Sequence, residues 1–473
     1  MKSFSLIELM IALWVMTMTT VFVAQASLTL PMAVQDAART ADALRLARFE
    51  ISTATASSTD IYSGTLSVER GEDVSRLNMR ASVSWKSLFG TPRTLSFFTV
   101  KSVPGIDSVC DPFVSGDWSH PIFESSVPVP GIIAALTSTH TILIVALSSA
   151  HSANDATLLF YSVHGTSSPV LVSEFDNAST SRTGFSSVAR DDDILFAGSA
   201  FASDSTATCK DGISCAQIQV YDTKAPNGPE LAGAFSFATS STPYAVAAGG
   251  TPAAVRSLTY SGGFLYAGLH KTVSGDEFNI LDAHNPANLA WVSGIRVGRT
   301  VNNIQIRDRY AFVSTDDPAR ELLIVDIHDP THPRVAGTWD ARGSTSFGYG
   351  ATSTVHNGII RFGRSYTNNG SEFQLLDAQD PSHIQLLEEA DIGTARDPES
   401  VRALLTQDWL TFALLTHRLL LWNTGTSGTL APFAASSYEL PTGSVGISLA
   451  CRDNQLYIAR NTATGGIIDV LRG

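Results

Sequence analysis

Aspartates that recur at one position of a repeated pattern are the residues best placed to do chemistry in this sequence. Four segments have an apolar stretch that ends in Asp, with Pro four residues later. These residues are Asp222 and Pro226, Asp282 and Pro286, Asp326 and Pro330, and Asp377 and Pro381. A carboxylate can ligate a metal ion or act as a general acid or base.

The repetition itself favours a structural role for these aspartates. A catalytic or metal site needs one asymmetric cluster, whereas here the same residue type returns at the same position of several units. An Asp at the end of a strand can accept hydrogen bonds from N–H groups of the next turn, and Pro restricts the backbone of that turn. We therefore expect each Asp to cap a turn and each Pro to fix it.

Other polar residues indicate solvated turns rather than a reaction. The acidic clusters Asp191–Asp193 and Asp316–Asp317 could contribute to a cation site, but the sequence has no D-x-[DN]-x-[DN]-G calcium-binding loop. The eleven His are scattered, and no G-x-S-x-G, P-loop or H-E-x-x-H motif is present. The sequence thus predicts no catalytic residue, no metal and no cofactor, and we expect that the protein is not an enzyme.

Four cysteines could form disulfides if the chain is exported. Cys209 and Cys215 flank the short polar stretch KDGIS, so we predict a small disulfide-closed loop, with two free thiols as the alternative. Cys110 and Cys451 have no partner nearby in the sequence. A bridge between them would tie the N-terminal side to the last repeat, and the sequence leaves this pairing open. A zinc site is not predicted, because the sequence has no C-x-x-C pair.

The composition indicates an extracytoplasmic, mainly β protein. Charged residues make up 16% of the 473 residues, below the roughly 25% that is usual for soluble proteins. The net charge is −13 and no cluster of Lys or Arg stands out. Nucleic acid is therefore excluded as a partner, because phosphate binding requires basic surface.

The repeated aspartates belong to larger units that must position them. Weaker copies of the pattern occur at Ser162, Asn423 and Asp469, so that seven copies recur 44 to 60 residues apart. Each copy reads as the third of four short strands, which is the size of a β-propeller blade. The seventh copy ends after its third strand, and we expect the segment Ser119–Val129 to supply the missing outer strand.

The repeats resemble the LVIVD family, whose signature is an apolar strand that ends in Asp and is followed by a D/N-P turn. The segment LLIVDIHDPTHPRVAGTWD is the best match. The resemblance implies a propeller fold and no particular activity. The longest loops, predicted at Ala200–Cys215, Thr239–Pro252 and Gly343–Tyr349, are rich in Ser, Thr, Gly, Tyr and Phe. They would suit recognition of a glycan or a protein.

The N-terminus differs in kind from the repeats. An apolar run begins at Phe4 and contains one carboxylate, Glu8. The run has about the 20 residues that span a bilayer, and a charge there costs about 2.5–3.5 kcal/mol on insertion scales. A secretory signal peptide cleaved after the A-x-A sequence at Ala24–Ala26 is one alternative, and a signal anchor is another.

The stretch SFSLIELMIAL resembles the N-terminus of type IV pilins and pseudopilins. The resemblance implies that prepilin peptidase cuts between Ser3 and Phe4, that Phe4 is methylated, and that Glu8 pairs with a neighbouring subunit during filament assembly. The family usually has Gly before the cut, where this chain has Ser3. The implied partners are prepilin peptidase, other pilin or pseudopilin subunits and the inner membrane.

These observations predict four parts and a mainly β fold. The segment from Pro31 has a small apolar helical face, and residues 60–102 alternate like strands of a small antiparallel sheet. The stretch VSWKSLFGTPRTLSFFTV resembles the hairpin of minor pilins. The predicted parts are a leader (1–3), a long transmembrane and amphipathic helix (4–58), a small pilin-like sheet with linker (59–114), and a seven-bladed propeller (115–473).

The expected function is therefore that of a minor pilin-like or pseudopilin-like protein. One inner-membrane helix would deliver the propeller to the cell surface or a pilus tip for adhesion or partner recognition. Two alternatives stay open: a membrane-tethered or secreted propeller enzyme with its site in the central channel, and a periplasmic scaffold that never enters a filament.

Overall fold

The computed structural model describes two parts of the chain. One part is three strands, for which the backbone alone is described, at residues 62–70, 76–86 and 92–102. The other part is residues 118–473 apart from 119, 140, 150–155, 164–167, 176–183, 200–215, 225–228, 238–253, 273–274, 342–347, 357, 368–369, 395, 408–409 and 424–430. By its internal contacts the chain divides into two compact units, Met1–Pro112 and Phe113–Gly473.

The first unit contains the predicted small sheet. Its strands β1 (Tyr62–Arg70), β2 (Arg76–Lys86) and β3 (Pro92–Ser102) pair antiparallel in the order β1-β2-β3. The alternation of residue types in this segment therefore predicted its strands correctly. The helix predicted over residues 4–58 lies outside the described residues, as do Ser3, Phe4 and Glu8. No helix in the described part of the chain is long and apolar enough to cross a bilayer.

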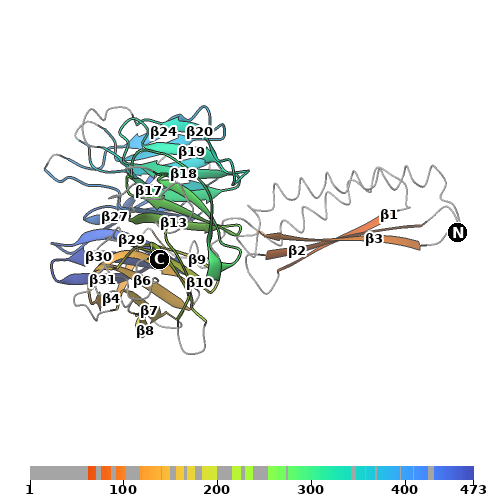
Figure 1. Cartoon of the computed structure of the whole chain (residues 1–473), viewed down its shortest axis with the longest axis horizontal. Coiled ribbons are helices and arrows are strands. Elements are labelled where there is room, and N and C mark those ends of the chain that lie inside the picture. The colour runs from red at the N-terminus through yellow and green to blue at the C-terminus, as the bar shows by residue number, and fades with distance from the viewer. Residues whose placement is uncertain are drawn as a thin grey trace. The chain divides into compact units, whose positions relative to one another are not determined.

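The second unit is a seven-bladed β-propeller (Figure 1). Each blade is an antiparallel sheet of four strands. Blades one to three consist of β5 (Ile132–Ser138), β6 (Ile142–Ser149), β7 (Leu158–Ser162) and β8 (Val170–Phe175); β9 (Phe185–Asp191), β10 (Ile194–Ser199), β11 (Ile218–Asp222) and β12 (Glu230–Phe235); and β13 (Val255–Ser261), β14 (Phe264–Leu269), β15 (Phe278–Asp282) and β16 (Ala290–Ile295). A short 3-10 helix, η4 (Pro286–Asn288), precedes β16.

Blades four to seven have the same strand order, and the last one borrows a strand. They consist of β17 (Val301–Arg307), β18 (Tyr310–Thr315), β19 (Leu322–Asp326) and β20 (Arg334–Trp339); β21 (Gly350–His356), β22 (Ile359–Arg364), β23 (Phe373–Asp377) and β24 (Gln385–Ala390); β25 (Ala403–Gln407), β26 (Leu410–Leu414), β27 (Arg418–Asn423) and β28 (Ala431–Glu439); and β29 (Val445–Arg452), β30 (Gln455–Thr462), β31 (Gly465–Arg472) and β4 (Ile122–Val129).

The borrowed strand closes the ring. β4 pairs antiparallel with β31, with Val129 opposite Gly466 and Ile122 opposite Arg472. The first strands of successive blades lie side by side, and β29 returns to lie beside β5. The predicted role of Ser119–Val129 is therefore confirmed for the strand itself. Closure in this way protects a sheet edge that would otherwise be exposed.

The hydrophobic core lies between neighbouring blades. The third strands are apolar and almost wholly buried, as in β19 with LLIVD, because a blade packs on each of their faces. The fourth strands are more exposed to solvent, as in β24. Six of the seven third-to-fourth strand pairs shift register by one residue near the middle, and the pair β27–β28 has a larger shift. Such a bulge increases the local twist of an outer strand.

The register corrects one sequence-based assignment. In the earlier blades the repeated Asp pairs with the first residue of the second strand, for example Asp282 with Phe264. In blade seven the residue at that position is Arg472, which pairs with Gln455. Asp469 lies three residues earlier, is fully buried, and forms an ion pair with Arg460 at 2.6 Å. The terminal IIDVLRG resembled the repeat only because its apolar run ends in Asp at a different register.

The strand order gives the propeller two different faces. Turns from first to second and from third to fourth strands lie on one face, which we call the aspartate face because Asp222, Asp282, Asp326 and Asp377 end third strands there. Turns from second to third strands and the connections between blades lie on the other, which we call the connection face. The chain segments that contain the predicted long loops all begin and end on the connection face.

Candidate functional site

The repeated aspartates form one identical turn in four blades. Each Oδ1 accepts a hydrogen bond from the backbone N–H two residues later, which is the geometry of an Asx turn. The donors are Lys224 to Asp222 at 2.9 Å, His284 to Asp282 at 3.0 Å, His328 to Asp326 at 3.1 Å, and Gln379 to Asp377 at 2.9 Å. The four carboxylates stand in separate blades and are not brought together into a common site.

The prolines belong to the turns that follow these aspartates. Pro286 is the first residue of η4. Pro330 and Pro381 each follow a second Asp, whose carboxylate accepts a hydrogen bond from the backbone N–H two residues later. Thr331 N–H donates to Asp329 at 3.0 Å. The same pattern recurs when Ser382 N–H donates to Asp380 at 3.0 Å. Pro226 lies outside the described residues.

Asp326 differs from the other repeated aspartates because two arginines reach it. Its side chain is 7% exposed, and its carboxylate forms ion pairs with Arg309 at 2.5 Å and with Arg334 at 3.2 Å. The hydrogen bond from Arg309 is the main reason that its pKa falls well below the ordinary value. The side chain therefore stays charged and holds the outer strand to the turn between β17 and β18.

The predicted acidic clusters are local ion pairs and turns. Asp193 forms an ion pair with Lys224. Asp317 pairs with Arg320 at 2.9 Å, and Asp316 Oδ1 accepts the Thr300 N–H at 2.7 Å. These contacts occupy the carboxylates within their own blades. Cys209 and Cys215 lie outside the described residues, whereas Cys451 is buried and disulfide-bonded, with its partner outside the described part of the chain.

The connection face carries a second repeated position that the sequence reading did not identify. Five residues before the repeated Asp, the chain has a buried amide or carboxylate side chain. The residues at this position are Gln217, Glu277, Glu321 and Glu372. The constant spacing was present in the sequence and could have been found by aligning the repeats. The contacts that these side chains make could not be found in this way, because their partners come from loops and from other blades.

Glu277 and Glu372 hold two loops of the connection face together. Glu277 Oε2 accepts the N–H groups of Val297 and Gly298 at 2.9 and 2.8 Å, and its Oε1 accepts the N–H of Thr272 at 3.1 Å. Glu372 binds the equivalent groups: Ile392 N–H at 2.9 Å, Gly393 N–H at 3.2 Å and Thr367 N–H at 3.1 Å. Backbone N–H groups that converge on a buried carboxylate satisfy its charge.

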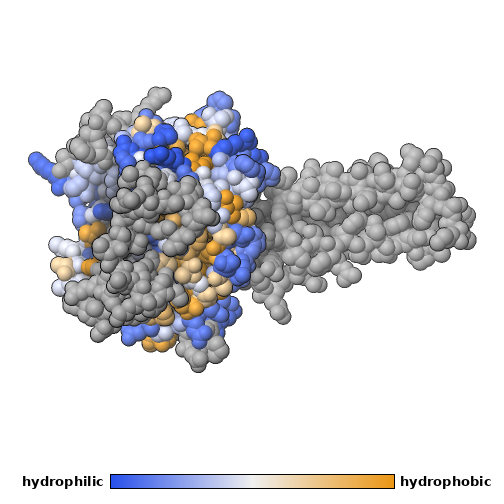
Figure 2. All heavy atoms as spheres, in the orientation of Figure 1, coloured by the Kyte–Doolittle hydropathy of each residue, from blue (hydrophilic) through white to orange (hydrophobic). Residues whose placement is uncertain are grey.

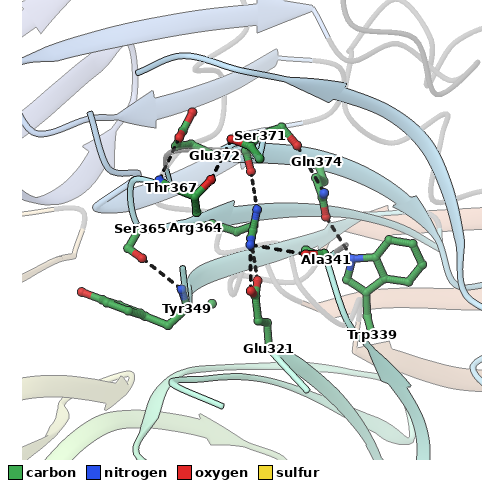
Figure 3. Close-up of polar contacts among 12 residues, drawn as sticks. Glu321, Trp339, Ala341, Tyr349, Arg364, Ser365, Thr367, Ser371, Glu372 and Gln374 are labelled. Carbon is green, nitrogen blue, oxygen red and sulfur yellow. Dashed lines mark hydrogen bonds and ion pairs between the residues drawn. The ribbon is translucent and has the colours of Figure 1, made fainter. Parts of the chain in front are cut away.

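Glu321 uses the same position differently (Figure 3). It receives two hydrogen bonds from Arg364 of the next blade, Nε to Oε2 at 2.5 Å and Nη2 to Oε1 at 2.7 Å. Both side chains are fully buried. Arg364 Nη1 also donates to the Ser371 carbonyl at 2.7 Å. A Cβ at Gly348 would lie 2.9 Å from Arg364 Nη2, so glycine leaves room there for the guanidinium.

Arginines also bind these loops of the connection face, through the loops' carbonyl groups. Arg320 donates to the Val297 carbonyl at 3.3 Å, and Arg364 donates to the Ala341 carbonyl at 3.5 Å. Arg418 donates to the Ile392 carbonyl at 3.2 Å. Val297 and Ile392 are thus held through their N–H by a carboxylate of one blade and through their C=O by an arginine of the next. Neighbouring blades are therefore joined by these polar contacts as well as by the apolar core.

Blade six departs from this arrangement. Arg418 occupies the position that is Gln or Glu in four other blades. The nearby carboxylate is Glu399, which comes from the connection between blades, and His417 and Asp397 lie beside it. Among the described residues, these three form the single group whose His and carboxylate atoms lie close enough to hold a metal ion. The residues are up to 20 positions apart on two loops, so their spacing gave no signal in the sequence.

Comparisons with known proteins support the fold. Residues 298–341, which span blade four, match the LVIVD repeat family. A search of curated protein sequences finds no significant match. A chain in the crystal structure of the mitotic checkpoint complex superposes with a TM-score of 0.51 at 12% sequence identity, over 74% of this chain and 94% of that chain. At this identity the likeness concerns the fold alone.

The fold and the repeats define the class of protein. It is a seven-bladed β-propeller that carries an LVIVD repeat in blade four, as predicted. The match of 361 solved chains to the structure shows how widely such a fold is used. A propeller alone therefore selects no function, and the function has to be argued from particular residues.

Proposed function

We propose that this chain is a minor pilin-like or pseudopilin-like protein that displays its propeller at the cell surface or at a pilus tip. There the propeller binds a partner, a glycan or a protein, and catalyses no reaction. The observation that carries the proposal is the N-terminal sequence, in which Ser3 and Phe4 form a processing point and Glu8 lies in an apolar run. A carboxylate kept at such a position calls for a polar partner, which a neighbouring subunit would supply.

The propeller supports a role in display. The chain enters it at β4, and β4 also completes the last blade, so the domain is closed. A closed domain of this kind can be carried on a stalk without sharing its core. The chain segments between β10 and β11, between β12 and β13, and between β20 and β21 all leave from the connection face, which makes that face the proposed binding surface.

The repeated polar residues support binding rather than catalysis. The aspartates of the aspartate face are taken up by turns, and Glu277, Glu321 and Glu372 are taken up by loops and by Arg364. Groups engaged in this way stabilise the scaffold on which variable loops are mounted. Recognition by loops on a rigid scaffold is a common use of such folds.

The test is the mature N-terminus of the full-length chain, expressed with and without prepilin peptidase. Mass spectrometry should find a chain that begins with methylated Phe4 only when the peptidase is present. Ser3→Gly should increase the cleaved fraction, and Ser3→Lys should abolish it. A mature chain that begins after Ala26 would instead identify a secretory signal peptide and would refute the proposal.

Filament assembly is tested separately. Glu8→Ala should leave cleavage intact but remove the protein from purified filaments, whereas the matched change Met10→Ala should have little effect. Unchanged incorporation of the Glu8→Ala variant would contradict the assembly role of Glu8. It would favour a membrane-tethered scaffold.

A further inference from the structure

Three metal-ligating side chains converge on the connection face of blade six. Asp397 and Glu399 lie in the connection from β24 to β25, and His417 lies in the turn between β26 and β27. One ligand atom from each lies within 4.8 Å of the others. His417 Nδ1 is 3.5 Å from Glu399 Oε1 and 4.0 Å from Asp397 Oδ1.

The backbone holds the two loops in this arrangement. Asp397 and Thr394 exchange backbone hydrogen bonds at 3.0 and 2.9 Å, which closes a tight loop before Glu399. Ser400 N–H donates to Thr416 Oγ1 at 3.1 Å and thereby ties this connection to the turn that carries His417. The His417 carbonyl in turn accepts the N–H of Leu440 at 2.8 Å. Ligands fixed by such supporting bonds are preorganised.

Glu399 is the buried member of this group. The residue is 1% exposed, and its Oε2 accepts the His417 N–H at 3.1 Å. Its Oε1 is turned toward the group and lies 3.5 Å from His417 Nδ1 and 3.9 Å from Arg418 Nε.

We propose that Asp397, Glu399 and His417 bind a divalent transition-metal ion of the zinc class. Imidazole favours zinc over calcium or magnesium, and carboxylate oxygens complete its usual ligand set. Zinc lies about 2.0–2.2 Å from such ligands, so small side-chain movements would bring the three atoms into contact with one ion. The proposal does not depend on the proposed role in a pilus.

The charges of the site favour a cation with moderate affinity. Two carboxylates contribute two negative charges, and Arg418 Nε lies 3.9 Å from Glu399 Oε1 and offsets one of them. The side chains of His417 and Asp397 are 47% and 65% exposed, so the site is open to solvent on one side. A bound ion would therefore keep a position for water, as zinc does when the protein supplies three ligands.

The test uses the full-length chain in mild detergent, stripped of metal with EDTA and kept oxidised so that thiols do not compete. Isothermal titration with ZnCl2 should give a saturable site with one ion per chain. Glu399→Gln and His417→Ala should weaken binding by at least the roughly 10–100-fold that loss of a group supporting metal ligands costs. Asp397→Asn, at an exposed residue, provides a variant with little risk to folding, and thermal melts establish that each variant is folded.

Matched controls come from the aspartate face. Asp380 and His383 form an exposed pair of the same residue types, 2.8 Å apart. Asp380→Asn and His383→Ala should leave zinc binding unchanged. Arg418→Gln should tighten binding because it removes a positive charge beside the site. Absence of a saturable site in the wild-type chain, or equal affinity in the wild type and in folded Asp397→Asn and His417→Ala chains, would overturn the proposal.

Discussion

The two faces of the propeller use the same repeats in opposite ways. On the aspartate face, Asp282 and Asp377 form the same local turn, with donors two residues away. On the connection face, the buried position five residues earlier is Gln or Glu in four blades, yet Glu277 binds loop N–H groups whereas Glu321 binds Arg364 of the next blade. One face repeats a local motif, and the other varies its partners from blade to blade.

The difference shows where a repeat protein can change without losing its fold. A turn closed by its own side chain tolerates little variation, because sequence and structure are tied over a few residues. A loop held by long-range contacts can exchange one partner for another, as blade six does with Arg418 and Glu399. Surface hydrophobic residues follow neither pattern, since those in view lie at several separate places (Figure 2). We therefore place functional variation on the connection face.

Breaking the Glu321–Arg364 pair should have the largest effect. Glu321→Gln leaves Arg364 buried without its full charge partner, and loss of one partner of a buried pair costs about 3–5 kcal/mol. Chemical denaturation should show this loss. The double variant Glu321→Met with Arg364→Met should recover most of the stability. Asp193→Asn, which breaks the exposed pair with Lys224, is the control and should cost no more than about 1 kcal/mol. An equally small loss of stability for Glu321→Gln would show that the long-range pair with Arg364 matters no more than a surface contact.

Removing a carboxylate that binds loop N–H groups should have the next largest effect. Glu372→Ala leaves the N–H groups of Thr367, Ile392 and Gly393 without their acceptor, and an unsatisfied buried group costs about 1–3 kcal/mol. We expect a net loss of about 2–3 kcal/mol in the free energy of unfolding, because water reaches part of the loop. Glu230→Ala, at an exposed position of β12, should be nearly neutral. Equal losses for the two variants would contradict the role of Glu372.

Removing an Asx turn should cost less. Asp282→Ala and Asp377→Ala should each lower the free energy of unfolding by about 0.5–1.5 kcal/mol, the net value of a typical hydrogen bond. Asp326→Ala should cost more than either, because it also leaves Arg309 and Arg334 without their carboxylate. Thermal or chemical denaturation of the three variants measures the order. If Asp326→Ala cost no more than the other two variants, the contacts with Arg309 and Arg334 would contribute nothing to stability.

The smallest effect should appear as a dependence on pH. The hydrogen bond from Ser382, and then that from His383, lower the pKa of Asp380 to about 2. A carboxyl with a lowered pKa stabilises the folded state above its unfolded pKa, near 3.9, and this contribution is lost as pH falls through about 2. The difference in melting temperature between wild type and Asp380→Asn should therefore shrink from pH 5 to pH 2. A difference that stayed constant with pH would contradict the ionic character of this turn.

The sequence predicted the fold in detail because the repeat is written in local patterns. Apolar strands that end in Asp, followed by Pro, predicted the blades, and the missing fourth strand of the last copy pointed to β4. The one misassigned copy is Asp469, because its apolar run reaches an Asp three residues before Arg472, which pairs with the start of the second strand. The candidate site could be predicted less well from the sequence. The position of Glu277, Glu321 and Glu372 recurs at a constant spacing, but their partners do not.

What the sequence by itself determined is the set of units, their number and the turn chemistry of the aspartate face. These features depend on hydrogen bonds and strand patterns within a few residues, which are legible from residue order. The tertiary structure alone decided that Glu321 meets Arg364, and that Asp397 and Glu399 meet His417. Those contacts cross between loops and blades, and their geometry depends on how the apolar faces of neighbouring sheets pack, which residue order does not state.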